Sequence, residues 1–419
     1  MEGVVSAMLG AGPACRNCGT PLRETFANLG MSPLANSFIA VERADRMEPF
    51  YPLHAFVCSD CRLVQLAEFE TPQAIFGDYA YFSSFSDSWL RHAENYAGVM
   101  TERLQLGVGS LVVEVASNDG YLLQYFARRG IRVLGIDPAA NVAAAAVEKG
   151  IPTEVAFFGA ETATRLAGAG QQPDVIAANN VLAHVPDLHD FAEGFRILLA
   201  PGGVFTCEFP HLLQLMREDQ FDTIYHEHFS YLSFFVVEKL FAQHGLTLFD
   251  VEKMPTHGGS LRIHGKHAVN RAFPVTDRVA ALRETEFTEG LDSIDTYRAF
   301  ARRVVDRKCE LLDFLVKARR QGETVAAYGA PAKGNTLLNY CGVGPELIAF
   351  TVDRSPHKQG RLLPGTRIPI RAPEALFEAK PHYVLILPWN LREEIAAQMA
   401  QVRAWGGRFV VPIPEIEIF

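Results

Sequence analysis

The sequence predicts an α/β protein, because it contains two strand–turn–helix units in addition to two cysteine pairs near its beginning. In the first unit an apolar run at 111–115 enters a small-residue turn at 116–120 and then a helix-like run at 121–128. The second unit begins with the run at 324–328 and a glycine-containing turn at 329–336. Such units build parallel sheets, and ligands bind where the strands end.

We therefore expect three domains. A small cysteine-containing domain should occupy residues 1–75, and a central domain that begins with a helical lid should occupy residues 76–254. A Rossmann-like α/β domain should occupy residues 255–419, with helices in its charged segment 277–320. With 419 residues, of which 48% are hydrophobic, the chain can form several separate cores.

The net charge of −9 argues against nucleic acid and against an anionic membrane surface as partners. The first fifteen residues contain no Lys or Arg and no apolar signal-peptide core, and no apolar run reaches the ~18 residues of a spanning helix. We expect a cytoplasmic protein with no evident obligate protein partner. Its seven cysteines are therefore not expected to form disulfides.

Four of these cysteines form two Cys-x-x-Cys pairs, Cys15 with Cys18 and Cys58 with Cys61. Each pair can supply two of the four thiolates of a tetrahedral site. Together they predict a structural Zn²⁺ site, because four sulfur ligands leave no coordination position open for catalysis. The alternative is two unrelated thiol pairs or one redox pair.

The turn of the first unit is the first candidate ligand site. It departs from the common Gly-x-Gly-x-Gly form, because only its last glycine is present. Its candidate ligand-binding residues are Glu114, Ala116, Ser117, Asn118 and Gly120. A plain βα corner with no ligand is the alternative.

Two later features indicate which ligand this turn binds. Asp137 ends the second strand, about 20 residues after the turn, where an acid can accept hydrogen bonds from ribose hydroxyls. Asn179 and Asn180 end a later strand, and the segment 198–203 reads Leu-Leu-Ala-Pro-Gly-Gly. This ordered set resembles the fold of S-adenosylmethionine (SAM)-dependent methyltransferases.

Two aromatic stretches flank the predicted cofactor site. Phe157 and Phe158 follow the third strand, where such folds cover the adenine ring, although both rings could equally belong to the core. The segment 76–85 contains Tyr79 and precedes a helix predicted over 86–104. It is either an interdomain linker or a lid that supplies a tyrosine to the substrate.

The segment 225–231 concentrates groups that titrate or donate protons, including Tyr225, Glu227 and His228. One alternative is a second metal site. Another is a turn whose polar side chains are hydrogen-bonded within the protein. We favour acid–base chemistry, because no further carboxylate or cysteine cluster nearby completes a metal shell.

The C-terminal unit offers a second candidate ligand site. Lys333 and Asn335 lie near a helix N-terminus, where they suit a pyrophosphate, and Asp353 follows the next strand. The glycine turn lacks the dinucleotide spacing, so NAD is not expected. Residues 257–264 form a glycine turn and a short strand that could close the central sheet or touch a phosphate.

Taken together, these motifs resemble those of the deoxysugar C-methyltransferases over nearly the whole chain. The resemblance is carried by the cysteine pairs and by the segments 78–84, 116–120, 225–228 and 329–334. It implies a Zn-binding N-terminal domain, a central SAM domain and a C-terminal Rossmann-like domain. It also implies a dTDP-linked 4-keto-6-deoxysugar, bound between the last two domains and methylated at C-3′ (tetronitrose or kijanose type) or C-5′ in antibiotic sugar biosynthesis. The functional positions of that family match Tyr79, His184, Tyr225, Glu227, His228 and the turn 114–120.

That chemistry needs residues of these types. A carbon next to a ketone becomes nucleophilic only after a base removes its proton, and the enolate oxygen then needs a hydrogen-bond donor. A neutral histidine suits the base, a neighbouring glutamate can orient it and stabilise its imidazolium form, and a tyrosine hydroxyl can donate to the enolate. Other interpretations are an O- or N-methyltransferase, a nucleotide-sugar-binding protein without catalysis, and a metal hydrolase.

Overall fold

The computed structural model describes residues 13–71 and 82–419, and its largest sheet lies in the central part of the chain. This sheet has seven strands in the order β11-β12-β9-β8-β5-β6-β7. The strands are β5 (Leu111–Val115), β6 (Arg132–Asp137), β7 (Thr153–Val155), β8 (Val175–Asn179), β9 (Val204–Pro210), β11 (Leu246–Met254) and β12 (Ser260–His267). Strand β12 is antiparallel to both of its neighbours, β11 and β9, and the other pairs of the sheet are parallel. The connections reverse direction between β5 and β8, so the carboxyl ends of these strands flank a crevice.

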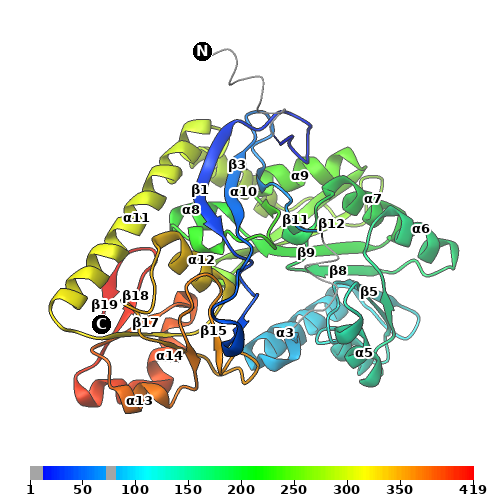
Figure 1. Cartoon of the computed structure of the whole chain (residues 1–419). Helices are drawn as coiled ribbons and strands as arrows, with labels where there is room; N and C mark the ends of the chain where they lie inside the picture. The colour runs from blue at the N-terminus through cyan, green and yellow to red at the C-terminus, as the bar shows by residue number, and fades with distance from the viewer. Residues whose placement is uncertain (1–12, 72–81) are drawn as a thin grey trace.

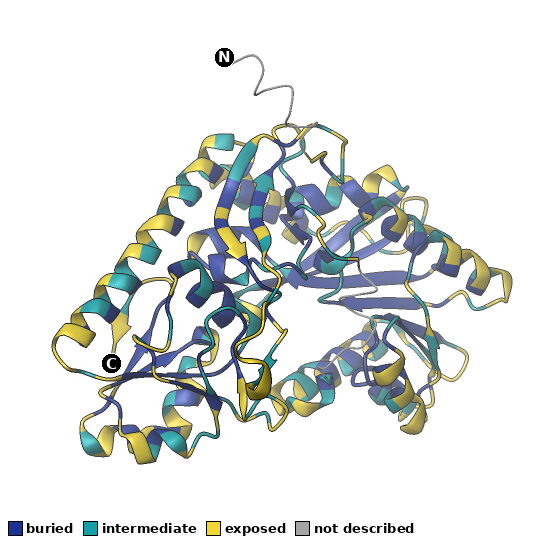
Figure 2. Cartoon of the chain, in the orientation of Figure 1, coloured by how far each residue is buried: buried dark blue, intermediate teal, exposed yellow. Residues whose placement is uncertain are grey.

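Helices cover both faces of this sheet, because alternate residues of β5 face opposite sides. Val113 and Val115 pack among α6 (Ala160–Gly168), α7 (Leu188–Leu198), α9 (Phe234–Gln243) and α10 (Asp277–Thr288). Val112 packs among α3 (Asp87–Leu104), α4 (Leu123–Ala127) and α5 (Ala140–Glu148). The strands are buried and the outer faces of the helices are exposed (Figure 2).

The C-terminal part contains a second sheet of six strands in the order β16-β14-β13-β17-β18-β19. They are β13 (Val325–Tyr328), β14 (Thr351–Val352), β16 (Ile370–Arg371), β17 (Tyr383–Ile386), β18 (Arg408–Val411) and β19 (Glu417–Ile418). All are parallel except β19, and the order reverses between β13 and β17. The helices of this part are α11 (Ile294–Arg320), α12 (Ala332–Cys341), α13 (Ala375–Ala379) and α14 (Arg392–Gln398).

The N-terminal part forms a third sheet with residues from the middle of the chain. Strands β1 (Glu24–Ser32), β3 (Tyr51–Val57) and β4 (Val64–Leu66) are extended by β10 (Ser230–Tyr231). A second link is β2 (Ile39–Ala40), which pairs with β15 (Arg361–Leu362) of the C-terminal part. Helix α11 lies beside β1 (Figure 1). The ring of Phe300 stacks on that of Phe26 with centroids 4.6 Å apart.

The three parts are therefore interleaved more closely than three consecutive domains would be. The predicted limit at residue 254 separates β11 from β12, although these strands pair with each other in the central sheet. Of the two roles considered for residues 257–264, closing the central sheet is the one that β12 fulfils. The domain limits themselves stay a prediction.

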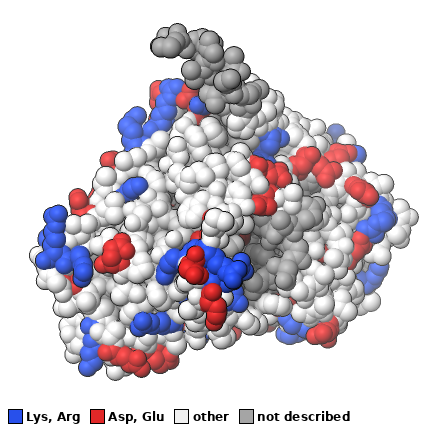
Figure 3. All heavy atoms as spheres, in the orientation of Figure 1, with Lys and Arg blue, Asp and Glu red and all other residues white. Residues whose placement is uncertain are grey.

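The surface carries acidic and basic side chains interspersed on the face shown in Figure 3. Within the described part of the chain, every helix is too short or too polar to cross a membrane.

Candidate functional site

The four paired cysteines meet at one point beside the N-terminal sheet. The Sγ atoms of Cys15 and Cys61, and those of Cys18 and Cys58, lie 3.5 Å apart. All four sulfur atoms lie within 4.8 Å of one another. A tetrahedron with Zn–S bonds of about 2.3 Å has sulfur atoms about 3.8 Å apart, so these thiols fit one Zn²⁺ ion.

The turn between β5 and α4 has the backbone conformation of a glycine-rich loop. Ala116, Asn118 and Gly120 all have positive φ, with values of 56°, 50° and 77°. This left-handed region costs a residue with a side chain about 1–2 kcal/mol. Ala116 and Asn118 therefore adopt the conformation that glycine usually supplies in this turn. The turn keeps its shape although both glycines are replaced.

Polar atoms without protein partners gather where β5 and β8 end. Among the described residues, Ser117 Oγ and Asn179 Oδ1 lack a hydrogen bond, and the buried Glu114 carboxylate interacts with the hydroxyl of Tyr121. Burial raises the pKa of Glu114 well above its usual value. An unpaired buried polar group costs about 1–3 kcal/mol, so this crevice suits a polar ligand that supplies the missing partners. These acceptors fit SAM, whose hydroxyl and amino groups donate hydrogen bonds.

Asp137 lies at the end of β6, beside the same turn. Its two carboxylate oxygens accept hydrogen bonds from the backbone N–H groups of Asn118, at 2.8 Å, and Ala139, at 2.9 Å. Burial raises its pKa, and these two hydrogen bonds oppose that shift. Asp137 is thus fixed at the edge of the crevice, and its contact with a ribose stays a prediction.

The short helix η2 (Ser83–Phe85), just before α3, contacts this turn. The N–H of Ser83 donates to Asn118 Oδ1 at 2.9 Å, and Ser84 Oγ donates to Asp119. Lys149 Nζ also lies 2.8 Å from Asp119. The predicted lid residue Tyr79 lies outside the described residues.

The two phenylalanines predicted near the adenine ring differ in their surroundings. The ring of Phe158 packs edge-on against Phe191 and Phe195, with both centroid distances 5.4 Å. Phe157 is 42% exposed. Phe158 therefore contributes to the core, and Phe157 is the member of the pair with free surface. Asn180, which follows β8, has a positive φ of 54° and donates its N–H to Glu208 O.

The predicted acid–base residues lie together, next to the crevice. His184 belongs to the short helix η3 (Leu182–His184) after β8, and its ring centroid lies 4.8 Å from that of His228. The ring of Tyr225 lies 4.1 Å from that of His228. Burial lowers the pKa of His184 to about 4 and that of His228 well below its usual value. Both histidines are therefore neutral near pH 7.

The hydrogen bonds of the two histidines define their tautomers. His184 Nδ1 lies 2.7 Å from the carbonyl oxygen of Glu227, and His228 Nδ1 lies 3.0 Å from that of Thr223. A carbonyl can only accept, so each Nδ1 carries the proton. Each Nε2 then carries the lone pair that can take up a further proton.

Two other side chains of the segment 225–231 contact the N-terminal part of the chain. His226 Nε2 contacts the carbonyl oxygen of Pro52 at 3.2 Å, so this histidine faces the N-terminal sheet. Glu227 Oε1 accepts a hydrogen bond from Asn36 Nδ2 at 2.7 Å. Within the described ranges, the groupings that could hold a metal are the four cysteines and Asp250 with Glu252 and His264.

Lys333 lies at the reversal point of the C-terminal sheet. Its ammonium lies 4.1 Å from the centroid of the Trp389 ring and donates to Asn390. Trp389 Nε1 in turn donates to Asp222 Oδ2 at 2.8 Å. Burial lowers the pKa of Lys333 to about 8, opposed by Asp222, so the ammonium remains largely charged near pH 7.

The other two predicted substrate residues are held within the protein. Asn335 is 1% exposed, and its Nδ2 donates to the carbonyl oxygen of Ala35 at 2.6 Å. Asp353 accepts hydrogen bonds from the N–H groups of Ala330 and Ser355, both at 2.8 Å. Their proposed contact with a nucleotide thus competes with internal hydrogen bonds, whereas Lys333 extends from the end of its helix.

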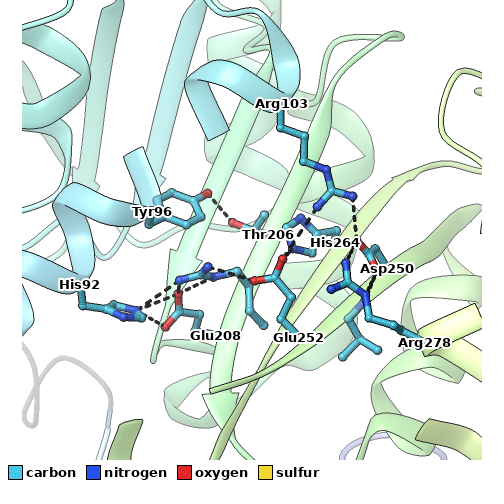
Figure 4. Close-up of polar contacts among 11 residues, drawn as sticks. His92, Tyr96, Arg103, Thr206, Glu208, Asp250, Glu252, His264 and Arg278 are labelled. Carbon is cyan, nitrogen blue, oxygen red and sulfur yellow. Dashed lines mark hydrogen bonds and ion pairs between the residues drawn. The ribbon is translucent and has the colours of Figure 1, made fainter. Parts of the chain in front are cut away.

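A buried ion-pair network that sequence reasoning missed fixes α3 to the outer strands of the central sheet (Figure 4). Glu208 on β9 lies 2.9 Å from His92 Nε2 and accepts from Arg262 Nε at 2.7 Å. The ring of Trp89, one turn before His92, lies 6.0 Å from that of Tyr121 at the turn after β5. The network therefore positions a helix that borders the cofactor crevice. The sequence gives no local signal for it, because its members are far apart along the chain.

The second carboxylate grouping belongs to the same network. Asp250 accepts from Arg103 Nη2 at 2.7 Å and from Arg278 Nε at 2.8 Å, and Glu252 lies 3.2 Å from Arg262 Nη1. Burial opposes ionisation of Asp250, but its bonds to Arg278, Thr276 and Arg103 hold its pKa below the usual value. Arginines already supply the positive charge here, so we assign no metal to this grouping.

Comparison with known proteins matches family models to most of the chain. A zinc-binding domain matches residues 15–76, a methyltransferase domain matches 89–251, and a C-methyltransferase C-terminal domain matches 255–414.

Individual proteins match over different lengths. C-methyltransferase NovU of Streptomyces niveus is 38% identical over 401 residues, covering 96% of this chain and 95% of NovU. A ubiquinone biosynthesis O-methyltransferase of Methylobacterium sp. (strain 4-46) is 33% identical over 101 residues, covering 23% of this chain and 39% of that protein. The solved magnesium protoporphyrin IX methyltransferase of Synechocystis PCC 6803 is 16% identical, with a TM-score of 0.34 over 46% of this chain and 90% of that one.

Proposed function

We propose that the substrate of this enzyme is a dTDP-linked 4-keto-6-deoxysugar, which is methylated at C-3′. The chain belongs to the C-methyltransferase family that includes NovU, and it is a SAM-dependent enzyme with a zinc-binding domain. The proposed product serves antibiotic deoxysugar biosynthesis. The observation that carries the proposal is the ring cluster of His184, His228 and Tyr225, in which His184 belongs to the short helix that follows β8, a strand that borders the cofactor crevice.

Two neutral histidines with Nδ1 protonated are suited to removing a proton from carbon. We assign this step to His228, whose Nε2 takes the proton from the carbon next to the C-4′ ketone while the electron pair of that C–H bond forms the enolate. The resulting imidazolium is stabilised by the Thr223 carbonyl oxygen at Nδ1. His184 and Tyr225 lie against His228, and they are the groups that we place near the enolate oxygen, together with Tyr79.

The cofactor completes the reaction. SAM, when bound, supplies the methyl group, whose bond to sulfur breaks as the enolate carbon forms its new bond. We assign its binding to the turn 114–120, Asp137, Asn179 and Asn180, with the exposed Phe157 as the ring beside the adenine. Lys333 is the cation that we assign to the nucleotide diphosphate, because its ammonium remains charged near pH 7 at the end of a parallel sheet.

The position of the new methyl group in the product tests the proposal directly. The enzyme is incubated with SAM and a panel of dTDP-4-keto-6-deoxysugars, and the product is analysed by NMR. A new C–CH₃ group at C-3′ is expected with a 4-keto substrate. A methyl group at C-5′ would change the position, and one on oxygen or nitrogen would overturn the enolate mechanism.

The base is tested without methyl transfer. Wild-type enzyme with the 4-keto sugar and S-adenosylhomocysteine in D₂O should exchange the proton next to the ketone. His228→Asn should lose exchange and turnover by about 100-fold or more and still bind SAM, because a positioned general base contributes about 10²–10⁴-fold. His226→Asn is the matched control, since His226 faces Pro52. Near-normal exchange by His228→Asn would assign the base to another residue.

A further inference from the structure

A short turn of the N-terminal part reaches the acid–base cluster. Residues 33–37 follow β1, and the Asn36 amide donates to Glu227 Oε1 at 2.7 Å across 191 positions of the sequence. Asn36 is exposed and Glu227 is half-buried, as expected for groups at the rim of a substrate site. The acid–base segment therefore receives a contact from a part of the chain that carries no other predicted catalytic group.

Contacts with the C-terminal part hold this turn in place. The residue before Asn36 accepts, through its carbonyl oxygen, the hydrogen bond from Asn335 Nδ2 at 2.6 Å. Just after the turn, Ile39 and Ala40 pair with Leu362 and Arg361 in a two-stranded sheet. Within the turn, the N–H of Ser37 donates to Leu34 O at 3.1 Å, and that of Phe38 to Asn36 O at 3.0 Å. Asn36 thus extends from a rigid support.

The position of Glu227 affects both histidines of the cluster. Its carbonyl oxygen accepts from His184 Nδ1 at 2.7 Å, and the next residue along the chain is His228. Burial raises the pKa of the Glu227 carboxyl, and the Asn36 amide opposes this shift because it donates to the carboxylate form. Movement of Glu227 would therefore disturb the orientation of both histidines.

We propose that Asn36 is a positioning residue of the active site, which fixes the Glu227 carboxylate and through it the two histidines. This inference rests on the function proposed above. It assigns to the N-terminal part a role in the reaction in addition to holding zinc. It also explains why the turn is anchored on both neighbouring parts, since a group that orients a catalytic segment must itself be held.

The test replaces Asn36 by a residue of the same size and compares the result with a control substitution at the next position. Asn36→Asp keeps the size and turn preference of asparagine, but it removes the N–H donor and puts a second carboxylate beside Glu227. We expect kcat to fall at least tenfold, with the zinc content, the midpoint of thermal unfolding and the Kd for SAM unchanged. Ser37→Ala, in the same turn, is the control and should keep wild-type kcat. Wild-type kcat in Asn36→Asp would overturn the proposal.

A double-mutant cycle shows whether Asn36 acts through Glu227. In a Glu227→Gln background the donor and acceptor can exchange places, so adding Asn36→Asp should change kcat less than threefold. The same tenfold loss in both backgrounds would mean that Asn36 acts elsewhere, and it would overturn the proposal.

Failure of the proposed function is a separate outcome. It appears as a wild-type enzyme that methylates oxygen or nitrogen or exchanges no proton. The cycle is then measured on the product that wild type forms, and it still decides whether Asn36 acts through Glu227.

Discussion

The central and C-terminal sheets share the order of their parallel strands, which reverses after the first strand of each, but their reversal points are built differently. At the central one, Ser117 and Asn179 leave buried polar atoms without partners in the described structure. At the C-terminal one, the small residues pack the turn against the neighbouring strand end. A Cβ added to Gly329 would come within 2.6 Å of Pro388, and one added to Gly334 within 2.9 Å of Leu387.

The difference teaches that a parallel sheet with a glycine turn does not by itself make a cofactor site. Asp137 and Asp353 each accept two backbone N–H bonds, so the two turns do not differ there. They differ in packing and in the number of unpartnered atoms: Ser117 Oγ and Asn179 Oδ1 at the central turn, against Asn335 Oδ1 at the C-terminal one, where the glycines pack closely against the neighbouring strand end. Lys333 is then the group that the C-terminal sheet can offer to a substrate from its helix end. Four experiments can break or sharpen this contrast.

The largest effect should follow the loss of zinc. Binding of a structural Zn²⁺ contributes about 10–16 kcal/mol to the folding of small zinc domains. Cys58→Ser should lower the zinc content well below one equivalent and abolish turnover, because the N-terminal part carries the turn that contacts Glu227 and Asn335. SAM affinity at the central reversal point should change less than tenfold. Cys309→Ser, which alters an exposed cysteine outside the site, is the control. Wild-type enzyme that purifies with no zinc would contradict the assignment.

Asp137 and Asp353 hold equivalent places after the second strand of each sheet. Asp137→Ala should weaken SAM binding at least tenfold, or about 1.4 kcal/mol, as expected for one lost charge-assisted hydrogen bond. Asp353→Ala should leave SAM binding unchanged. Isothermal calorimetry measures both dissociation constants, and equal effects of the two changes would remove the contrast between the sheets.

Lys333 tests the substrate side of the comparison. Lys333→Ala should raise the KM for the dTDP-sugar about tenfold and leave the Kd for SAM unchanged, because one cation lost from a diphosphate site costs about 1–2 kcal/mol. Lys358→Ala should change KM less than threefold, since the Lys358 ammonium is already held 2.9 Å from Ala330 O. If the Lys333→Ala enzyme has a normal KM, Lys333 does not bind the substrate and its role is structural, through its contact with Trp389.

The smallest effect concerns the two turns themselves. Ala116→Gly should stabilise the protein by at most about 1 kcal/mol, because Ala116 has a positive φ of 56° that glycine adopts without strain. Ala330→Gly should destabilise it by a similar amount, because Ala330 in the C-terminal turn does not have positive φ. The midpoints of thermal unfolding should move in opposite directions. Movement in the same direction would show that the turns do not differ in this way.

Much of the molecule could be predicted from local sequence. Periodic apolar runs and turn residues predicted an α/β protein, and the structure confirms α3 close to the predicted 86–104 and helices within 277–320. The two Cys-x-x-Cys pairs and the family resemblance are also confirmed, by the meeting of the four thiols and by the match to NovU. These features follow from short stretches of chain, where spacing alone limits the geometry.

The predictions for individual site residues remain to be tested, but the structure already separates them by surroundings. Glu114, His184 and His228 lie around the crevice, whereas Asn335 is engaged with Ala35. Periodicity cannot make this distinction, because it reports which face of an element a residue occupies and not which distant segment covers that face.

The sequence by itself therefore determined the strand–turn–helix units, the zinc ligands and the types of chemical group available for the reaction. Only the tertiary structure decided that β12 belongs with the central sheet, that Ala116 and Asn118 take the place of glycines, and that Asn36 contacts Glu227. The physical reason is the range of the interactions. Local propensities and metal-ligand spacing act over a few residues, whereas the pairing of Asn36 with Glu227 depends on how three sheets pack together.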